Sequence, residues 1–321
     1  MSSADPIATV ADGITSIDTV MAGERQLNAV YLLDAAEPCL VETGPGADHG
    51  RLVASLDSLG LGPAHLAHVV VTHIHMDHAG GAGALLGRYP NARLWVHESG
   101  AKHLVDPTRL IASTARTYGE ARMRALYGET RPVDANRVRG VVDGDVIILG
   151  DRTLRVVHTP GHASHHVAIH DDRSGAMCTG EAIGTYLPWA DCYRPALPPP
   201  EVDVDAALAS IDSMRRRHPT ALLTSHFGPA PDPAEAFDRA AERIQVWADD
   251  VREILERDPA SQESEIVDAL TQRARVEFEA DAGRAFERER YDVLGSIRMN
   301  AQGLSRYWRK RWEREGEEPS G

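Results

Sequence analysis

One stretch of the sequence, VVVTHIHMDHAGG at residues 69–81, decides how the chain folds and what it binds. Three consecutive valines are typical of a buried strand, and the closing pair of glycines suits the start of a helix. Between them, three histidines and one aspartate fall within six residues. Histidine is the commonest metal ligand among side chains. A solvated polar loop is the plain alternative, but three converging imidazoles would repel one another once protonated. We therefore expect a cation to hold them.

The spacing within this stretch predicts how its side chains are shared between ions. In a tight loop after a strand, residues at i and i+2 point at one centre, which groups His73 with His75. The next polar pair, Asp77 and His78, then points at a neighbouring centre. The sequence thus predicts two adjacent metal sites at the end of a strand.

The composition of the chain disfavours several classes of function. The 321 residues are 42% hydrophobic, enough for a substantial core, and carry a net charge of −14. This acidic balance disfavours a nucleic-acid binder, because such proteins neutralise phosphates with Lys and Arg. Three cysteines lie far apart and form no CxxC motif, which predicts a reducing, cytoplasmic location. The start of the chain lacks the pattern of a signal peptide, and no apolar run approaches the roughly 18 residues of a membrane span.

The pattern along the chain changes near Pro229. Before it, strands alternate with helices, apart from a helical insertion at residues 106–134. After it, the chain is charged, almost free of proline and periodic as in helices, with Ile244, Trp247 and Val251 on one face. We therefore predict a main domain at residues 1–230 and an all-helical C-terminal extension at 231–321. A homodimer through these helices is a hypothesis.

The pattern His73-x-His75-x-Asp77-His78, followed by Gly80 and Gly81, resembles the signature of the metallo-β-lactamase fold superfamily. Further stretches resemble that family's landmarks in the same order: TGPG at 43–46, TPGH at 159–162, CTGE at 178–181 and TSHFG at 224–228. The resemblance covers roughly residues 20–230. It implies an α/β fold, a four-layer αββα sandwich of two mixed β-sheets, with the helical extension outside it.

The resemblance also implies a set of metal ligands. His73, His75 and His162 would bind the first metal, and Asp77, His78 and His226 would bind the second. A carboxylate would bridge them, and here the chain has Glu181 where the family usually has Asp. The longer Glu side chain can reach from further back or ligate one metal alone. Two more residues enter as alternatives or supports: Asp191 as another carboxylate, and His166 behind the ligands. The expected cofactors are two divalent ions, first Zn²⁺, with Mn²⁺ or Fe²⁺ as alternatives.

The implied activity is hydrolysis by a metal-bound hydroxide, with Asp77 and His78 in the catalytic centre. The chain resembles the glyoxalase II, lactonase and related hydrolase branches more than true β-lactamases, which suggests an ester, thioester or lactone. A phosphodiesterase or ribonuclease of the same fold is the first alternative. A mononuclear iron dioxygenase acting on a thiol or persulfide is the second, less favoured because the second ligand set is complete. A non-enzymatic metal-holding scaffold is the third.

One loop bears on the substrate, which we expect to be a small molecule. The loop at residues 184–200 carries four side chains that would line a pocket with aromatic walls and one anion contact: Tyr186, Trp189, Tyr193 and Arg194. A proline-rich loop packed on the surface is an equal alternative. The basic and aromatic run at 306–312 is interpreted as a packed helix rather than a nucleic-acid contact, and no membrane partner is expected.

Overall fold

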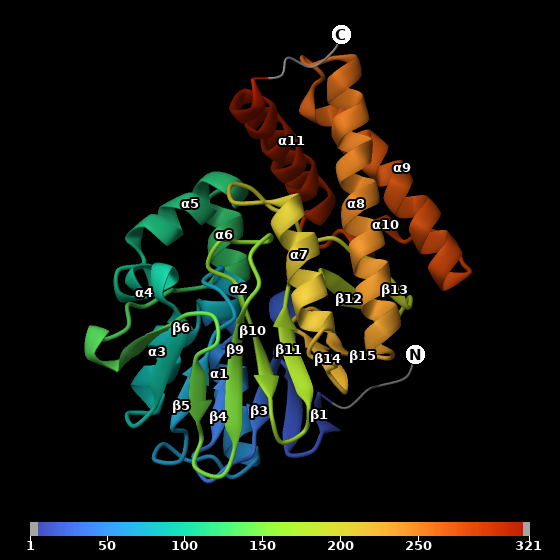
Figure 1. The fold of residues 1–321 in the computed structure, drawn as a ribbon. Coiled ribbons are helices and arrows are strands. Elements are labelled where there is room, and N and C mark those ends of the chain that lie inside the picture. The colour runs from blue at the N-terminus through green and yellow to red at the C-terminus, as the bar shows by residue number, and fades with distance from the viewer. Residues whose placement is uncertain (1–5, 317–321) are drawn as a thin grey trace. The chain divides into compact units, whose positions relative to one another are not determined.

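The computed structural model describes residues 6–316. Residues 1–5, at the start of the segment that lacks the pattern of a signal peptide, lie outside this range. The described chain divides into two compact units (Figure 1). The first unit runs to residue 158 and adds residues 165–180 and 218–231. The second unit consists of residues 159–164 and 181–217 and of the chain from residue 232 onward. The domain boundary predicted near residue 230 stays a prediction.

The first sheet of the first unit has seven strands in chain order. The first four strands are antiparallel, and the pairs from β4 to β7 are parallel. The sheet is therefore mixed, as the sequence resemblance implies. Its strands are β1 (Ile7–Ala11), β2 (Ile14–Asp18), β3 (Ala29–Leu33), β4 (Cys39–Val41), β5 (His68–Val70), β6 (Arg93–His97) and β7 (Val138–Val141).

The second sheet of the first unit is also mixed, with the strand order β15-β14-β11-β10-β9-β8. Only β11 and β14 pair in parallel; the other neighbours are antiparallel. The strands are β8 (Val146–Ile148), β9 (Thr153–His158), β10 (Val167–Asp171), β11 (Ala176–Gly180), β14 (Ala221–Thr224) and β15 (Gly228–Ala230).

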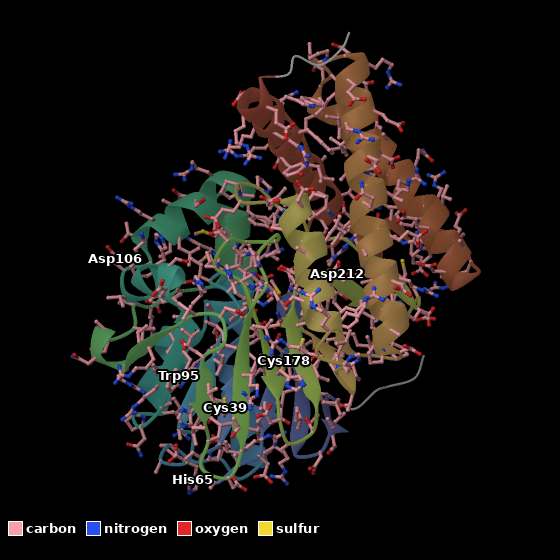
Figure 2. All side chains as sticks on the ribbon, viewed as in Figure 1. Cys39, His65, Trp95, Asp106, Cys178 and Asp212 are labelled. Carbon is pink, nitrogen blue, oxygen red and sulfur yellow. The ribbon has the colours of Figure 1, made fainter. Side chains whose placement is uncertain are left out.

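Apolar side chains fill the space between the two sheets. Cys39 on β4 and Cys178 on β11 both face this core, where neither is more than 4% exposed (Figure 2). A second core lies on the other face of the first sheet, where Leu52, Leu56 and Leu85 from helices pack on it. Burying each such leucine contributes about 1.5–3 kcal/mol. The helices and short turns of this unit are η1 (Met21–Gly23), η2 (Gly46–Asp48), α1 (His49–Ser58), α2 (Met76–Ala79), α3 (Ala82–Arg88), α4 (Glu98–Val105), α5 (Thr108–Tyr118), α6 (Glu120–Tyr127) and η3 (Ala135–Arg137).

The second unit is mostly helical. On its longest helix the predicted apolar face is buried, because Ile244, Trp247 and Val251 are each at most 2% exposed. The loop predicted at 184–200 differs from expectation in one respect, since a two-stranded hairpin forms within it. The elements are β12 (Thr185–Leu187), β13 (Cys192–Arg194), α7 (Val204–Arg215), α8 (Pro233–Arg257), α9 (Glu263–Ala282), α10 (Arg288–Tyr291) and α11 (Ser296–Glu315). Among residues 6–316, no helix is long and apolar enough to cross a membrane.

Candidate metal centre

The loop that follows β5 carries the histidine motif, and the start of a short helix spaces its side chains. β5 ends at Val70, and His75 precedes the first residue of α2 with an extended backbone. His73 and His75 therefore lie ahead of the helix, while Asp77 and His78 lie within its single turn. This change of backbone conformation separates the motif into two pairs, as the spacing predicts.

One set of potential ligands lies wholly in the first unit. It comprises Asp77, His78 and His226, each offering one ligand atom, and these atoms lie within 4.8 Å of one another. His226 comes from the chain that follows β14, and its Nε2 lies 3.3 Å from His78 Nε2 and 3.4 Å from Asp77 Oδ2. We call these residues the second metal set.

Hydrogen bonds made by the Nδ1 atoms determine which ring nitrogens of the second metal set point toward one another. The Nδ1 of His226 lies 2.5 Å from the carbonyl oxygen of Leu27, which can only accept, so this nitrogen carries the hydrogen. The Nδ1 of His78 likewise donates to the carboxylate of Glu42, at 3.1 Å. In neutral rings both Nε2 atoms then present lone pairs to each other. Two lone pairs cannot form a hydrogen bond with each other, but one cation can bind both. The residues present therefore fit a metal ion.

Glu42, which the sequence patterns do not single out, bonds to one of the predicted ligands. It is fully buried, directly after β4, and its carboxylate accepts four hydrogen bonds. Thr72 donates twice, from its hydroxyl at 2.5 Å and its backbone N–H at 3.3 Å. The Ser225 hydroxyl donates at 3.0 Å, and His78 provides the fourth. The backbone φ of Glu42 is +70°, a left-handed conformation that costs a residue with a side chain about 1–3 kcal/mol.

Glu42 also orients His73, through Thr72. Because the Thr72 hydroxyl donates to Glu42, its oxygen accepts from His73 Nδ1, 3.0 Å away. The Nε2 of His73 is then free of its hydrogen and lies 3.0 Å from His75 Nδ1. These two nitrogens form a second preassembled pair in the first unit. One buried carboxylate therefore positions histidines from both predicted metal sites.

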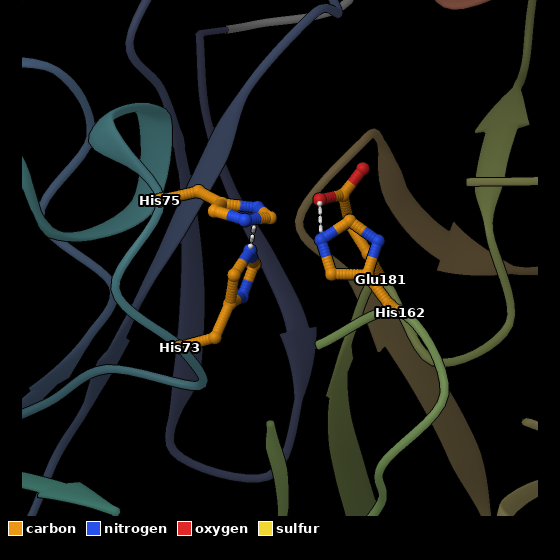
Figure 3. Close-up of side chains that lie close together, drawn as sticks. All are labelled: His73, His75, His162 and Glu181. Atoms are coloured by element: carbon orange, nitrogen blue, oxygen red, sulfur yellow. Dashed lines mark hydrogen bonds and ion pairs between the residues drawn. The ribbon is translucent and has the colours of Figure 1, made fainter. Parts of the chain in front are cut away.

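The remaining predicted ligands, His162 and Glu181, lie in the second unit. The Nδ1 of His162 donates to the carbonyl oxygen of Ala196 at 2.9 Å, and its Nε2 lies 3.0 Å from Glu181 Oε2. Figure 3 draws this pair and the pair of His73 and His75. The sequence resemblance predicts that these four residues share one metal, and we call them the first metal set. The predicted role of Glu181 as a bridge between two metals stays a prediction.

Two buried groups, Tyr31 and Cys178, interact with Glu42 and are neutral. Burial raises the pKa of the Tyr31 hydroxyl and of the Cys178 thiol well above their usual values, and the charge of Glu42 adds to both effects. The Tyr31 hydroxyl donates to the carbonyl oxygen of Thr224, the last residue of β14. Both groups therefore stay protonated near neutral pH, and Glu42 is the charge behind the ligands.

The predicted supporting residue His166 lies directly behind the motif. It is fully buried, with its ring centroid 5.0 Å from that of His73. A Cβ at Gly180 would come within 2.5 Å of His166 Nε2 and 2.6 Å of Thr72 Oγ1, so only glycine fits between these groups. The position suits a supporting role for His166, which stays a prediction.

The four predicted substrate contacts are packed within the second unit. Tyr186 donates to Asp191 at 2.9 Å and packs on Tyr193, with ring centroids 4.9 Å apart. Arg194 is buried and donates to the carbonyl oxygen of Tyr291. Trp189 lies beneath the guanidinium of Arg290, 4.0 Å from the ring centroid. Asp191, the alternative carboxylate, belongs to neither metal set. Contact of these side chains with a substrate stays a prediction.

Comparison with known proteins assigns the family. The family model described as the metallo-β-lactamase superfamily matches residues 22–226, and the chain belongs to this superfamily. The N-acyl homoserine lactonase AttM of Rhizobium radiobacter is 24% identical over 195 residues, which span 59% of this chain and 68% of that protein. The acyl-coenzyme A thioesterase MBLAC2 of Homo sapiens is 31% identical over 131 residues, 39% of this chain but only 45% of the thioesterase.

Solved structures share the fold. A metallo-β-lactamase superfamily protein from Sulfolobus tokodaii, ST1585, superimposes with a TM-score of 0.66 at 20% identity, covering 91% of this chain and 98% of its own. A β-lactamase domain protein from Burkholderia ambifaria gives 0.65 at 20% identity, with 98% and 92% covered. The predicted fold class, an αββα sandwich of two mixed sheets with a helical C-terminal extension, is confirmed.

Proposed function

We propose that the chain is a hydrolase that works with two divalent metal ions, one held by each metal set. The observation that carries this proposal is the facing pair of Nε2 atoms on His78 and His226, 3.3 Å apart, while each Nδ1 is committed to a hydrogen bond. Imidazole and carboxylate ligands with such outer partners are typical of zinc sites. Zn²⁺ is therefore the first expectation, with Mn²⁺ or Fe²⁺ as alternatives.

The charges of the ligands support a hydrolytic role. The histidines are neutral ligands, so Asp77 and Glu181 are the anionic groups in the two sets. Two divalent ions held by these groups would keep a net positive charge. When bound, such ions lower the pKa of water to about 7 and polarise the oxygen of a substrate carbonyl. Asp77 would balance charge in the second set, beside the two histidines that Glu42 and Leu27 hold in place.

A carboxylic ester, thioester or lactone is the substrate class that we propose, in a small molecule. The relatives named above as a lactonase and as an acyl-coenzyme A thioesterase support this choice. Both reactions would place a carbonyl carbon at the metals and release an alcohol or a thiol. A reducing compartment is also part of the proposal, because the three cysteines are buried as free thiols.

Metal analysis combined with a substrate panel tests this function. Purified protein should contain about two zinc or manganese ions per chain and hydrolyse at least one lactone or thioester. A phosphodiester and a persulfide complete the panel. One iron per chain with oxygen uptake on the persulfide would refute hydrolysis, and activity on the phosphodiester alone would refute the substrate class.

Three variants test the ligands. His75→Ala and Asp77→Ala should each abolish hydrolysis, whereas His65→Ala should not. His65 is an exposed histidine that accepts a hydrogen bond from Gly62 and lies at the lower end of the view in Figure 2. Retained activity in Asp77→Ala would argue for a single metal. The predicted homodimer is tested separately by light scattering, where a monomer mass would remove it.

A further inference from the structure

The last helix of the chain anchors a loop that has few hydrogen bonds of its own. Residues 195–200 read PALPPP, so Ala196 and Leu197 are the two residues there that possess a backbone N–H. Asn300, on α11 and 1% exposed, contacts this loop with both ends of its amide. Its Oδ1 accepts from Leu197 N at 2.6 Å, and its Nδ2 donates to Pro195 O at 2.9 Å.

Close packing of α11 on the same loop reinforces these bonds. A Cβ at Gly303 would lie 1.9 Å from the carbonyl oxygen of Leu197, so the helix approaches the loop backbone as closely as glycine permits. One turn further on, Arg306 donates to the carbonyl oxygen of Pro200 at 3.3 Å. The path of the loop is therefore set by α11.

The residue between the two anchor points faces a predicted metal ligand. Ala196 is flanked by Pro195 and Leu197, and its carbonyl oxygen accepts from His162 Nδ1 at 2.9 Å. This bond places a hydrogen on Nδ1 and directs Nε2 toward Glu181 Oε2, 3.0 Å away. The chain around His162 is held from α7 as well, where the Ser210 hydroxyl donates to the carbonyl oxygen of Pro160 at 2.7 Å.

From this chain of contacts we propose that Asn300 is a positioning residue for the first metal. By fixing the loop on both sides of Ala196, it orients the carbonyl that sets the tautomer and the ring direction of His162. The helical extension thus takes part in building the metal centre. The proposal rests on the proposed function only in requiring that His162 binds a metal.

The test measures metal affinity rather than turnover. Metal-free protein is titrated with Zn²⁺ in competition with a chromophoric chelator, in an Asp77→Ala background that removes a ligand of the second metal set. Asn300→Ala should weaken the remaining site by up to roughly 10-fold, the lower end of the effect of losing a ligand's outer partner, because the Ala196 carbonyl itself remains. Asn300→Ser keeps a small polar group without placing a charge in the core and should show a smaller loss, and it decides the matter if Asn300→Ala does not fold.

Trp308→Phe is the matched control. Trp308 lies on the same helix and donates from its indole nitrogen to the carbonyl oxygen of Ala248 at 2.8 Å, with no bond to the loop. This variant should lower the melting temperature and leave Zn²⁺ affinity unchanged. Unchanged affinity in both Asn300 variants would overturn the proposal, as would a loss in Trp308→Phe that matches Asn300→Ala. A parent protein that binds Zn²⁺ but hydrolyses nothing would overturn only the proposed function, because the affinities would still decide the role of Asn300.

Discussion

Replacing Glu42 by glutamine tests how strongly one buried carboxylate supports the metal centre. Three donors meet its Oε1: the hydroxyls of Thr72 and Ser225, and His78 Nδ1. The backbone N–H of Thr72 meets Oε2. A glutamine amide has one acceptor oxygen, so even in its better orientation its NH₂ faces the N–H of Thr72. The variant also loses the negative charge that strengthens the other three bonds.

The expected magnitude follows from these bonds. A hydrogen bond to a charged group contributes about 1.5–3 kcal/mol, and one such bond is lost while three are weakened. We expect Glu42→Gln to lower the free energy of unfolding of the metal-free protein by about 2–4 kcal/mol. Affinity for the second metal should fall by roughly 10–100-fold, because His78 loses its charged outer partner.

Urea unfolding and Zn²⁺ titration measure the two effects, with Glu37→Gln as the matched control. Glu37 also pairs with a histidine, His68, at 2.8 Å, but the carboxylate side chain is 56% exposed. An exposed pair contributes at most about 1 kcal/mol, so Glu37→Gln should leave metal affinity unchanged. If Glu42→Gln unfolds within about 0.5 kcal/mol of the parent and binds metal equally well, the reasoning is wrong.

Three further predictions concern packing, metal removal and pH. Gly180→Ala should destabilise the protein by about 1–3 kcal/mol, since its Cβ would collide with His166 and Thr72; an unchanged melting temperature contradicts this. Removal of metal by EDTA should lower unfolding free energy by about 2.7 kcal/mol if the metal was present at 100 times its Kd, and re-addition should restore it in calorimetry. Burial raises the pKa of Glu277 from 4.5 to about 7, so the folded chain keeps a proton that the unfolded chain loses. Stability should therefore fall by up to about 3 kcal/mol as pH rises from about 4.5 to 7. Glu277→Gln should flatten this dependence in urea titrations at pH 5 and 8, and identical profiles would disprove it.

Local patterns in the sequence were enough to predict the histidine motif and the helices after residue 230. The motif residues lie within six positions, so one loop conformation determines where they point. The apolar repeat of α8 likewise depends on helix geometry alone, and its buried face follows from Ile244, Trp247 and Val251. Such features involve residues that are close in sequence, so the sequence alone is enough to predict them.

Features that depend on distant partners were not predicted. In the sequence, Glu42 looks like any acidic residue after a strand. Its contacts depend on Thr72 and Ser225, which lie 30 and 183 positions away. An acid directly after a buried apolar strand and before a glycine turn was the available signal. The aromatic residues at 186–193 show a related difficulty, because composition alone does not say whether side chains that pack within the second unit also line a pocket.

The bond between Ser225 and Glu42 has a consequence for how the protein is made. It joins positions 183 residues apart, so nearly the whole first unit must leave the ribosome before this carboxylate gains its last donor. A nascent chain that ends before residue 225 already carries His73, His75, Asp77 and His78 but lacks His226. The second metal set is therefore completed only after residue 226 has been made, when β14 joins β11. Zinc captured at that moment would mark the end of folding of the first unit rather than guide its beginning.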